Sequence, residues 1–541
     1  MDGLLERTVA ALLVACFYLA ASGKLVAVMQ QCGYDGGRFM RWYLKKENAF
    51  KGRFGYFAVL SLFATYGMAL SFSFLEGSLP LVVSAIPFFF FCILFFWADK
   101  CYALKVPCAK SGRFYRLSLA YLAALAIVCF LVISLCSFLG GLFLSFGTPD
   151  WVLLARYAPV SLLPMLFPFV LWAANAVEGA FENARNAKFV KRAGQVLDES
   201  KAMKIAVVGS YGKTSVKGIL GALLAARYKT VISPASYNTP VGVAKTLQTV
   251  GAKEAEAFVF EMGARKLGDI RELCELVKPD LVVFTGVCAQ HLEGFKSEEN
   301  VLRGKCECLQ SVTKKVICAE SLQEKIENAS FLTAEEKSKC AFVSVEAGAK
   351  NISLQAEKTS FTLCVGGKEI FVETALLGNM AVENILLAAN AAYALGVSAE
   401  EIAERVSALS PVAHRLELKK ENGVYILDDA YNANEKGAAE AIEALCRFEG
   451  KKYLVTPGII ETGVLEREIN GNLGARIAAA QIEFTALVGG RQVKAVKEGY
   501  LSAGGEEGKI GVYSTLEKAV QSLPLETGDA VLFLNDLPDA Y

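Results

Sequence analysis

The chain has 541 residues, which is long enough for roughly three or four domains. Its hydrophobic fraction of 54% and its mean hydropathy of +0.37 exceed those of an ordinary soluble enzyme. The formal net charge of +1 gives no electrostatic reason to expect a nucleic-acid partner, and we expect none. The apolar excess lies in residues 1–180. We therefore predict an apolar N-terminal region followed by a globular region of ordinary composition.

Five apolar segments of the N-terminal region are long enough to cross a membrane as helices. They cover residues 8–29, 57–75, 79–98, 117–146 and 151–177. The last segment contains Pro159, Pro164 and Pro168, which predict a kinked or interfacial helix. The sequence therefore predicts a membrane domain of about five transmembrane helices over residues 1–180, in contact with a lipid bilayer.

The charges of the connecting segments predict the orientation of these helices. The connections after the first, third and fifth apolar segments contain clusters of lysine and arginine, whereas the other two carry only Glu76 and Asp150. Because positively charged connections stay in the cytoplasm, we predict an N-terminus outside the cell and a large C-terminal region inside it. A buried bundle of apolar helices is the alternative, and the alternating charge argues against it.

The cysteines give no sign of disulfide bonds or of a metal centre. Fifteen are present, and several lie inside the apolar segments. We expect free thiols in a reducing compartment. Cys306 and Cys308 are close in sequence, but no second pair with ligand spacing accompanies them, so we expect no zinc site there.

A phosphate-binding loop is predicted at residues 209–215, Gly-Ser-Tyr-Gly-Lys-Thr-Ser. The apolar run 205–208 before it is typical of a buried strand, and the amphipathic pattern after it is typical of a helix. In this setting backbone N–H groups can surround phosphate oxygens, Lys213 can reach the β- and γ-phosphates, and Thr214 can bind Mg²⁺. The glycines are closer together than in the general P-loop, so a plain turn containing a lysine is the alternative. The predicted nucleotide-binding residues are Gly209, Ser210, Gly212, Lys213, Thr214 and Ser215.

The region after the apolar segments is predicted to be α/β. A polar, helical connector covers residues 181–203, and alternating strands and helices over residues 204–410 predict a doubly wound parallel sheet. Short strands from residue 315 to residue 375 predict a β-rich insertion. A third unit over residues 411–541 has strands at 424–427, 453–456, 484–488 and 530–533. The predicted fold is an α-helical transmembrane domain, a P-loop-type parallel-sheet domain and a C-terminal Rossmann-like α/β domain.

Five further motifs follow the loop. They are Ser-Tyr-Asn-Thr-Pro-Val-Gly at 236–242, Phe-Glu-Met-Gly-Ala at 260–264, Thr-Gly-Val-Cys-Ala-Gln-His-Leu-Glu-Gly-Phe at 285–295, His-Arg-Leu-Glu at 414–417 and Asp-Asp-Ala-Tyr-Asn-Ala-Asn at 428–434. Together they resemble the Mur ligases, above all the MurF branch of that family, over residues 204–541. The resemblance implies an ATP-dependent ligase of bacterial peptidoglycan precursor synthesis, which joins a carboxylate to an amine through an acyl phosphate.

The resemblance also implies substrates, cofactors and a location. The acceptor would be a muramyl peptide and the amine an amino acid or a dipeptide such as D-Ala-D-Ala, with ATP and Mg²⁺ as cofactors. The enzyme would be a multi-pass protein of the bacterial cytoplasmic membrane. The family holds the UDP moiety with a small N-terminal domain, and this chain has apolar segments there instead. A lipid-linked muropeptide or another amino-acid polymer is therefore an alternative acceptor. A degenerate ligase that serves as a membrane scaffold or nucleotide sensor is the alternative from a different class.

Matching the motifs residue by residue implies individual roles. Glu261 and His291 match Mg²⁺ ligands of the family, alongside Thr214. Lys305 matches a lysine that the family carbamylates, and Lys213, His291 and Lys305 are the predicted catalytic residues. Nucleotide binding is implied for Asn384, Arg415 and Asp429, and substrate binding for Asn238, Thr239, Tyr431, Asn432 and Asn434. For the substrate-binding positions a plain turn is the alternative.

Two segments depart from the family pattern. Met380 and Ala381 stand where the family has a pair of residues near the adenine. The segment 534–539 stands where the family has a Lys-Gly-Ser element that would handle the incoming amine. We therefore expect the contacts to the adenine and to the amine to differ from those of the family.

Overall fold

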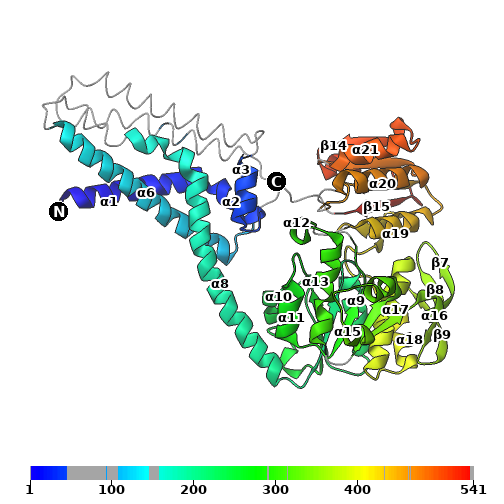
Figure 1. Cartoon of the computed structure of the whole chain (residues 1–541). Coiled ribbons are helices and arrows are strands. Elements are labelled where there is room, and N and C mark those ends of the chain that lie inside the picture. Colours follow the sequence, from blue (N-terminus) through cyan, green and yellow to red (C-terminus); the bar gives the residue numbers. More distant parts are fainter. Residues whose placement is uncertain are drawn as a thin grey trace. The chain divides into compact units, whose positions relative to one another are not determined.

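The structure is a computed structural model that describes residues 2–44, 90, 93, 108–144, 158–288, 292–312, 315–431, 433–460, 462, 465–490 and 492–535. The chain forms two compact units, Met1–Asn186 and Ala187–Pro538 (Figure 1). The described elements of the first unit are helices, and the described strands all belong to the second. The boundaries predicted at residues 204 and 411 stay predictions.

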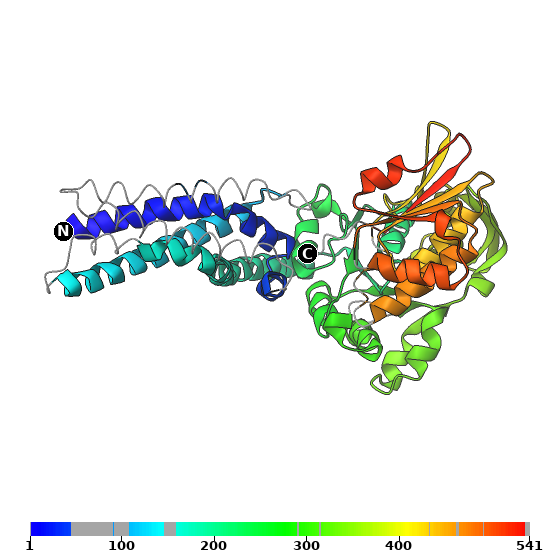
Figure 2. The same cartoon turned by 90° about the horizontal axis from the view of Figure 1, so that it is seen from above.

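The described elements of the first unit are α1 (Asp2–Ala21), α2 (Gly23–Gln31), α3 (Gly36–Leu44), α6 (Gly112–Leu144), the 3₁₀ helix η1 (Ala158–Leu166) and the first part of α8 (Phe167–Glu199). Helix α1 packs along α6 (Figure 2). Small or apolar side chains such as Ala15 and Leu125 are buried in this unit. Elsewhere on α6 large apolar side chains are exposed, namely Leu119, Ile127, Leu131, Leu135 and Phe138.

The described helices bear on three of the five predicted spans. Within the described residues, α6 and α8 are long and apolar enough to cross a membrane, and α1 with α2 would make a third span if the bent pair counts as one. That pair bends by 53° at Ser22, whose hydroxyl bonds the Tyr18 carbonyl and the Tyr121 hydroxyl, just before Gly23. The spans predicted at residues 57–75 and 79–98 fall, apart from residues 90 and 93, outside the described part of the chain.

Two prolines of the fifth predicted span lie on either side of the point where η1 ends and α8 begins. Pro164 is inside η1, and Pro168 is in the first turn of α8, where its missing N–H leaves no intrahelical bond unmade. The connector predicted at residues 181–203 is largely the second half of α8, which ends at Glu199. Leu197 at this end is fully buried against the core of the second unit.

A six-stranded parallel sheet forms the centre of the second unit, in the order β2-β3-β1-β4-β5-β6. Its strands are β1 (Met203–Val208), β2 (Thr230–Ile232), β3 (Ala257–Met262), β4 (Leu281–Phe284), β5 (Lys315–Ala319) and β6 (Cys340–Val343). The inner strands β3 and β4 are buried along their whole length, as their apolar sequences predict. The doubly wound parallel sheet predicted from residue 204 onward is thus observed.

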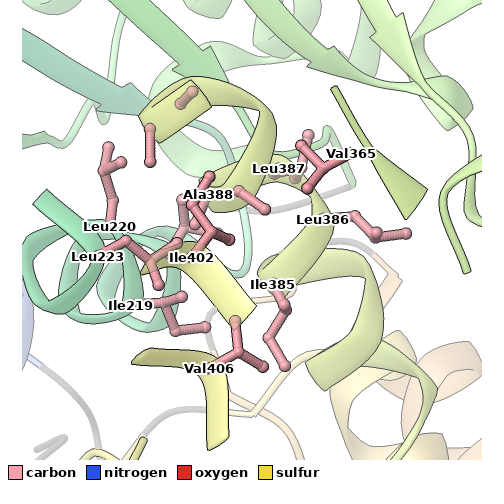
Figure 3. Packing of buried hydrophobic residues seen from close by; sticks show 14 of the residues in the cluster. Ile219, Leu220, Leu223, Val365, Ile385, Leu386, Leu387, Ala388, Ile402 and Val406 are labelled. Atoms are coloured by element: carbon pink, nitrogen blue, oxygen red, sulfur yellow. The ribbon is translucent and has the colours of Figure 1, made fainter. Parts of the chain in front are cut away.

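Helices cover this sheet and enclose two hydrophobic cores. They are α9 (Lys213–Leu224), α10 (Pro240–Thr246), α11 (Asp269–Val277), α13 (Glu298–Ser311), α17 (Asn379–Ala394) and α18 (Ala399–Ser407). One core joins α9, α17 and α18 through side chains such as Leu220, Ile385 and Ile402 (Figure 3). The other joins α11 and α13 to the sheet, with Leu273 and Leu309 among its members.

The predicted β-rich insertion is smaller than the sequence suggested. A separate antiparallel sheet contains only β7 (Ala349–Leu354), β8 (Thr359–Val365) and β9 (Lys368–Thr374). The prediction wrongly began the insertion at residue 315, because β5 pairs in parallel with β4, and β6 pairs in parallel with β5, so that both extend the main sheet. Short apolar strands have the same pattern in both settings, so the sequence did not separate them.

A second six-stranded sheet follows, in the order β10-β11-β15-β12-β13-β14. Its strands are β10 (Glu417–Glu421), β11 (Val424–Asp429), β12 (Lys452–Thr456), β13 (Phe484–Val488), β14 (Ile510–Tyr513) and β15 (Ala530–Leu534), with α19 (Glu435–Cys446), α20 (Glu466–Ala479), α21 (Gln492–Ser502) and α22 (Leu516–Gln521) between them. Only the edge strand β10 pairs antiparallel. The four predicted strands are confirmed. The two edge strands β10 and β14 were missed, and β10 is rich in charged residues.

Candidate functional site

The phosphate loop lies at the carboxyl end of β1, fastened to the end of β4. The backbone N–H of Ser210 donates to the Gly286 carbonyl at 2.8 Å, and the hydroxyl of Thr285 donates to the Tyr211 carbonyl. Gly212 has φ +73°, and a Cβ there would lie 2.7 Å from Asn384 Oδ1. The glycine therefore permits both the left-handed backbone and the close approach of α17. Asn384, a predicted nucleotide-binding residue, thus lies beside the loop.

Lys213 is the first residue of α9, and its amine folds back over the loop. Nζ donates to the carbonyl of Ser210 at 3.3 Å. Burial lowers the pKa of Lys213, the carboxylate of Glu261 opposes this, and Arg415 adds to the lowering. Lys213, Glu261 and Arg415 are thus close enough to interact electrostatically, which brings three predicted site residues together.

Glu261, at the carboxyl end of β3, is a buried carboxylate with three donors. Its side chain is 2% exposed. Oε2 accepts from Thr214 Oγ1 at 2.9 Å and from Lys217 Nζ at 3.3 Å, and Oε1 accepts from Asn238 Nδ2 at 3.3 Å. A buried charge is stable only when it is paired and hydrogen-bonded in this way. Two predicted Mg²⁺ ligands, Thr214 and Glu261, are therefore in direct contact.

The loop that carries Asn238 and Thr239 is held by the same strand end. The Gly263 N–H donates to the Asn238 carbonyl at 2.9 Å, and a Cβ on Gly263 would lie 2.7 Å from Asn238 Cγ. Thr239 Oγ1 accepts from the Gly242 N–H at 3.2 Å and caps α10. Asn238 therefore faces the site, whereas the hydroxyl of Thr239 caps α10, a structural role that the sequence analysis did not predict for it.

Lys305 is buried on α13 close to the phosphate-loop lysine. Its side chain is 2% exposed, and Nζ lies 6.0 Å from the centroid of the Phe295 ring. Burial lowers the pKa of Lys305 to about 7; Lys213 adds to the lowering, and Cys288 and Asp269 oppose it. This amine is therefore neutral in a large share of molecules near neutral pH. His291, the other predicted residue of this region, lies outside the described residues.

A second group of predicted residues lies on the C-terminal sheet, around the end of β11. Asp429 accepts from the backbone N–H of Leu416 at 3.1 Å. Burial raises the pKa of Asp429 to about 7, and the nearby Arg415 guanidinium opposes this. That guanidinium lies 4.4 Å from the centroid of the Tyr431 ring. Arg415, Asp429 and Tyr431 thus form one cluster.

Contacts between described residues join the C-terminal sheet to the central one at this site. The Tyr431 hydroxyl hydrogen-bonds the hydroxyl of Ser236, next to Asn238. Lys436 on α19 lies 2.8 Å from Glu383 Oε2 on α17 and 5.0 Å from the centroid of the Tyr211 ring in the phosphate loop. The hydrogen bond places Tyr431 near the predicted substrate loop, although Tyr431 and Ser236 are 195 positions apart in the sequence.

Asn434, a predicted substrate-binding residue, has a different role in the structure. Asn434 Oδ1 accepts from the Gly437 N–H at 2.9 Å and caps α19, so its side chain has a structural partner. Asn432 lies outside the described residues. Of the loop residues, Ser215 is half-buried in the first turn of α9.

The sequence analysis missed two polar residues that build the site. Lys217 is 3% exposed and donates a hydrogen bond to Glu261. Its position one turn after Lys213, on the apolar face of the predicted helix, could have indicated a buried lysine. Asn535 is 5% exposed, accepts from the Ala433 N–H at 3.0 Å and donates to the Gly458 carbonyl at 2.7 Å. It follows β15 where the family element was expected, and nothing local in the sequence indicated these partners.

One acidic group in the described part of the chain could in principle hold a metal ion. Ligand atoms of His414, Glu417 and Asp428 lie within 4.8 Å of one another. Lys419 Nζ lies 3.0 Å from Glu417 Oε2 and 2.8 Å from Asp428 Oδ2. The ammonium group already supplies the positive charge that these carboxylates require.

Comparison with known proteins gives the same family for the central region. Residues 207–392 match the model of the Mur ligase middle domain. The UDP-N-acetylmuramoyl-tripeptide–D-alanyl-D-alanine ligase of Bacillus subtilis (strain 168) is 27% identical over 344 residues, which are 62% of this chain and 74% of the relative. The ligase of the same name from Escherichia coli (strain K12) is 28% identical over 310 residues, 56% of this chain and 68% of the relative.

Solved structures have the same fold. The MurF ligase of Thermotoga maritima in complex with ADP is similar with a TM-score of 0.57 and 24% identity, over 65% of this chain and 80% of that one. A MurF structure from Acinetobacter baumannii gives a TM-score of 0.57 and 22% identity, over 65% of this chain and 77% of that one. At these identities the likeness to the solved structures shows the fold. Residues 207–392 therefore form a Mur ligase middle domain, and the chain is similar to MurF ligases beyond that region.

Proposed function

We propose that the chain is a membrane-anchored, MurF-like ligase of peptidoglycan precursor synthesis, which joins the carboxylate of a muramyl-peptide acceptor to an amine such as D-Ala-D-Ala. The observation that carries the proposal is the cluster of Lys213, Thr214, Glu261 and Lys305 beside the strand ends of one parallel sheet. Ligands gather at the carboxyl ends of strands in such sheets. The named activities of the relatives in Bacillus subtilis and Escherichia coli support the same choice.

The proposed chemistry has two steps. An oxygen of the acceptor carboxylate attacks the γ-phosphorus of ATP, the bond to the β,γ-bridging oxygen breaks, and ADP leaves an acyl phosphate behind. The amine nitrogen then attacks the acyl carbon, phosphate leaves, and the nitrogen loses a proton to give the amide. Negative charge accumulates on phosphoryl oxygens in the first step, so donors and cations fixed at that place favour it. Lys213 and the N–H groups of the loop are the proposed donors.

The oxygen ligands present suit Mg²⁺. A threonine hydroxyl and a buried carboxylate are hard oxygen donors of the kind that this ion prefers. Thr214 and Glu261 would hold the ion, with His291 as the third proposed ligand. When bound, Mg²⁺ would neutralise charge on the phosphoryl oxygens. Glu261 is kept in place for this by its three hydrogen bonds.

We propose that Lys305 is carbamylated. Its amine is neutral in a large share of molecules near pH 7, which the reaction requires, since the nitrogen lone pair attacks CO₂ and the nitrogen then loses a proton. The product is an anion. It would replace the repulsion between Lys213 and Lys305 by an attraction, and it would face the proposed phosphate and metal region.

The other predicted residues divide between nucleotide and substrate. Asn384 and the Arg415–Asp429 pair would contact the nucleotide, from α17 and from the C-terminal sheet. Asn238 and Tyr431 would contact the acceptor, since the Tyr431 hydroxyl already meets the loop before Asn238. Thr239, Asn432 and Asn434 remain proposed substrate-binding positions.

We propose that the N-terminal region places this chemistry at the bacterial cytoplasmic membrane, with the second unit in the cytoplasm. Two described helices, α6 and α8, are long and apolar enough to cross a bilayer. Exposed apolar side chains along α6, such as Ile127 and Leu131, suit a lipid environment. A lipid-linked muropeptide is the alternative acceptor that this location favours.

Phosphate release by the full-length protein in detergent tests the proposal. Each reaction contains ATP, Mg²⁺ and D-Ala-D-Ala with either UDP-muramyl tripeptide or its lipid-linked counterpart, and the Lys213→Ala variant is the control. Acceptor-dependent release by the wild type, lost in the variant, supports the ligase. Release with the lipid-linked acceptor alone assigns acceptor recognition to the lipid. Absence of release with both acceptors would overturn the muramyl-peptide proposal.

A further inference from the structure

Lys217 is a buried lysine of α9 that shares the carboxylate of Glu261 with Thr214. It lies one helical turn after Lys213 and is 3% exposed. Its Nζ lies 3.3 Å from Glu261 Oε2 and also donates to the carbonyl of Ala235. A buried ammonium group is costly unless it is paired and hydrogen-bonded, and these two acceptors meet that need.

The two acceptors of Lys217 belong to two parts of the proposed site, the metal-binding carboxylate and the substrate loop, which must act together. Glu261 is the proposed Mg²⁺ ligand at the end of β3. Ala235 has φ +42°, a left-handed conformation that a residue with a Cβ seldom adopts. The turn at Ala235 leads directly to Ser236, which bonds Tyr431, and to Asn238, which bonds Glu261. A single ammonium group thus holds the carboxylate and the unfavourable turn of the substrate loop.

The hydrogen bonds of Lys217, the substrate loop and Glu261 form a closed ring. Asn238 returns from the turn to Oε1 of Glu261, while Lys217 and Thr214 occupy Oε2. The carboxylate is therefore fixed from both oxygens, and the loop is fixed at Ala235 and at Asn238. Loss of Lys217 would release one anchor of each.

From this geometry we infer that Lys217 is a positioning residue that aligns the substrate loop 235–239 with the carboxylate of Glu261. It acts through these two partners and makes no contact with ATP. This inference rests on the proposed function. It adds that two lysines on one face of α9 have different roles. Lys213 serves the phosphates, and Lys217 serves the acceptor side.

Lys217→Met tests this inference, because methionine keeps an unbranched stem and removes the ammonium group. The matched control is Lys339→Met, since Lys339 Nζ also has two oxygen acceptors, the carbonyls of Leu309 at 3.4 Å and Val312 at 3.3 Å, away from the site. Lys217→Arg, which keeps the charge, is the rescue variant. Steady-state kinetics give KM for ATP and for the acceptor separately.

We expect Lys217→Met to raise the KM for the acceptor about tenfold and to lower kcat, with the KM for ATP within about twofold of the wild type. Lys217→Arg should recover much of the loss, and Lys339→Met should leave both KM values unchanged. An unchanged acceptor KM in Lys217→Met would reduce Lys217 to a structural residue. An equal rise of both KM values would make it a phosphate contact. Either result overturns the inference.

Hydrogen exchange keeps the inference testable when no substrate turns over. The backbone amides of residues 235–243 should exchange faster in Lys217→Met than in the wild type or in Lys339→Met, in protein without substrate. Equal exchange in the three proteins would contradict the inference whatever the substrate is. Absence of turnover by the wild type would instead count only against the proposed function. If Lys217→Met does not fold, Lys217→Gln takes its place in both measurements.

Discussion

The hydroxyl of Thr214 donates a 2.9 Å hydrogen bond to the carboxylate of Glu261. The two residues come from different elements, the first turn of α9 and the end of β3, which are neighbours because β1 and β3 pair in parallel with Val208 opposite Met262. This contact brings together the two oxygen ligands proposed for Mg²⁺.

Glu261→Gln should lower kcat about 100-fold, because the proposed metal site loses its negative charge while the shape of the side chain is kept. The variant should also lose about 3 kcal/mol of stability, since Lys217 remains buried without a charged partner. Activity assays and urea denaturation measure the two effects.

Glu373→Gln is the matched control, because Glu373 pairs with Lys358 at 2.8 Å with both side chains about half exposed. We expect that change to cost less than about 1 kcal/mol and to leave kcat unchanged. Equal kcat values for the two variants would exclude Glu261 from the reaction.

Lys305→Met should stabilise the protein in CO₂-free buffer. The folded-state pKa of Lys305 is about 7, below the ordinary lysine value of 10.5, so the unfolded chain binds more protons between these pH values. Stability contributed by this group therefore rises with pH from about 7 to 10.5 and is lowest at and below pH 7. The gain from the substitution should accordingly be largest near pH 7 and should shrink as the pH rises. Denaturation at a series of pH values measures it.

The same pair of proteins tests carbamylation. Added bicarbonate should raise the melting temperature of the wild type and leave that of Lys305→Met unchanged, because only the wild type can form the carbamate. Lys253→Met, on an exposed lysine, should respond to bicarbonate as the wild type does. A wild type that does not respond would argue against a carbamate at Lys305.

Lys436→Met should raise the KM for ATP about fivefold, since it removes the ion pair with Glu383 and the contact with the Tyr211 ring in the phosphate loop. Both side chains of the ion pair are partly exposed, which keeps the expected effect modest. Lys497→Met is the control, because Lys497 on α21 forms an ion pair with Glu507 at 3.2 Å, away from the loop. A KM for ATP that matches the control would show that this contact does not support nucleotide binding.

Asn535→Ala should destabilise the protein by about 2 kcal/mol, because the buried Ala433 N–H and Gly458 carbonyl lose their partner. Asn472→Ala should cost less than about 0.5 kcal/mol, since Asn472 bonds Glu435 at an exposed position. Thermal denaturation of the two variants gives the comparison. Equal losses would mean that the Asn535 bridge contributes no more than a surface contact.

How far the sequence predicted the site depends on how local each part is. The phosphate loop was predicted because a strand, a glycine turn and a helix follow one another directly around Lys213. Lys217 was missed because its partners, Glu261 and Ala235, are distant in sequence or lie in an irregular turn. Asn535 was missed for the same reason, since Gly458 lies 77 positions away.

For the fold as well, features set by neighbouring residues were predicted, and features set by contacts between distant residues were not. Apolar strands such as β3 and β12 were predicted from short runs of residues. The edge strand β10, Glu-Leu-Lys-Lys-Glu, lacks such an apolar run, because its side chains are half-buried or exposed. The pairing of β5 with β4 and of β6 with β5 was not predictable, because a strand's sequence does not identify its neighbours.

The central claim is that the acceptor's carboxylate is activated by phosphoryl transfer, and oxygen-isotope transfer tests it most directly. The full-length protein is given ATP, Mg²⁺, the amine and an acceptor whose reacting carboxylate carries ¹⁸O at both oxygens. Attack on the γ-phosphorus followed by displacement of phosphate leaves one carboxylate oxygen on the released phosphate, so we predict ¹⁸O-labelled phosphate in a one-to-one ratio with the amide product. Unlabelled phosphate formed together with the amide would contradict the account.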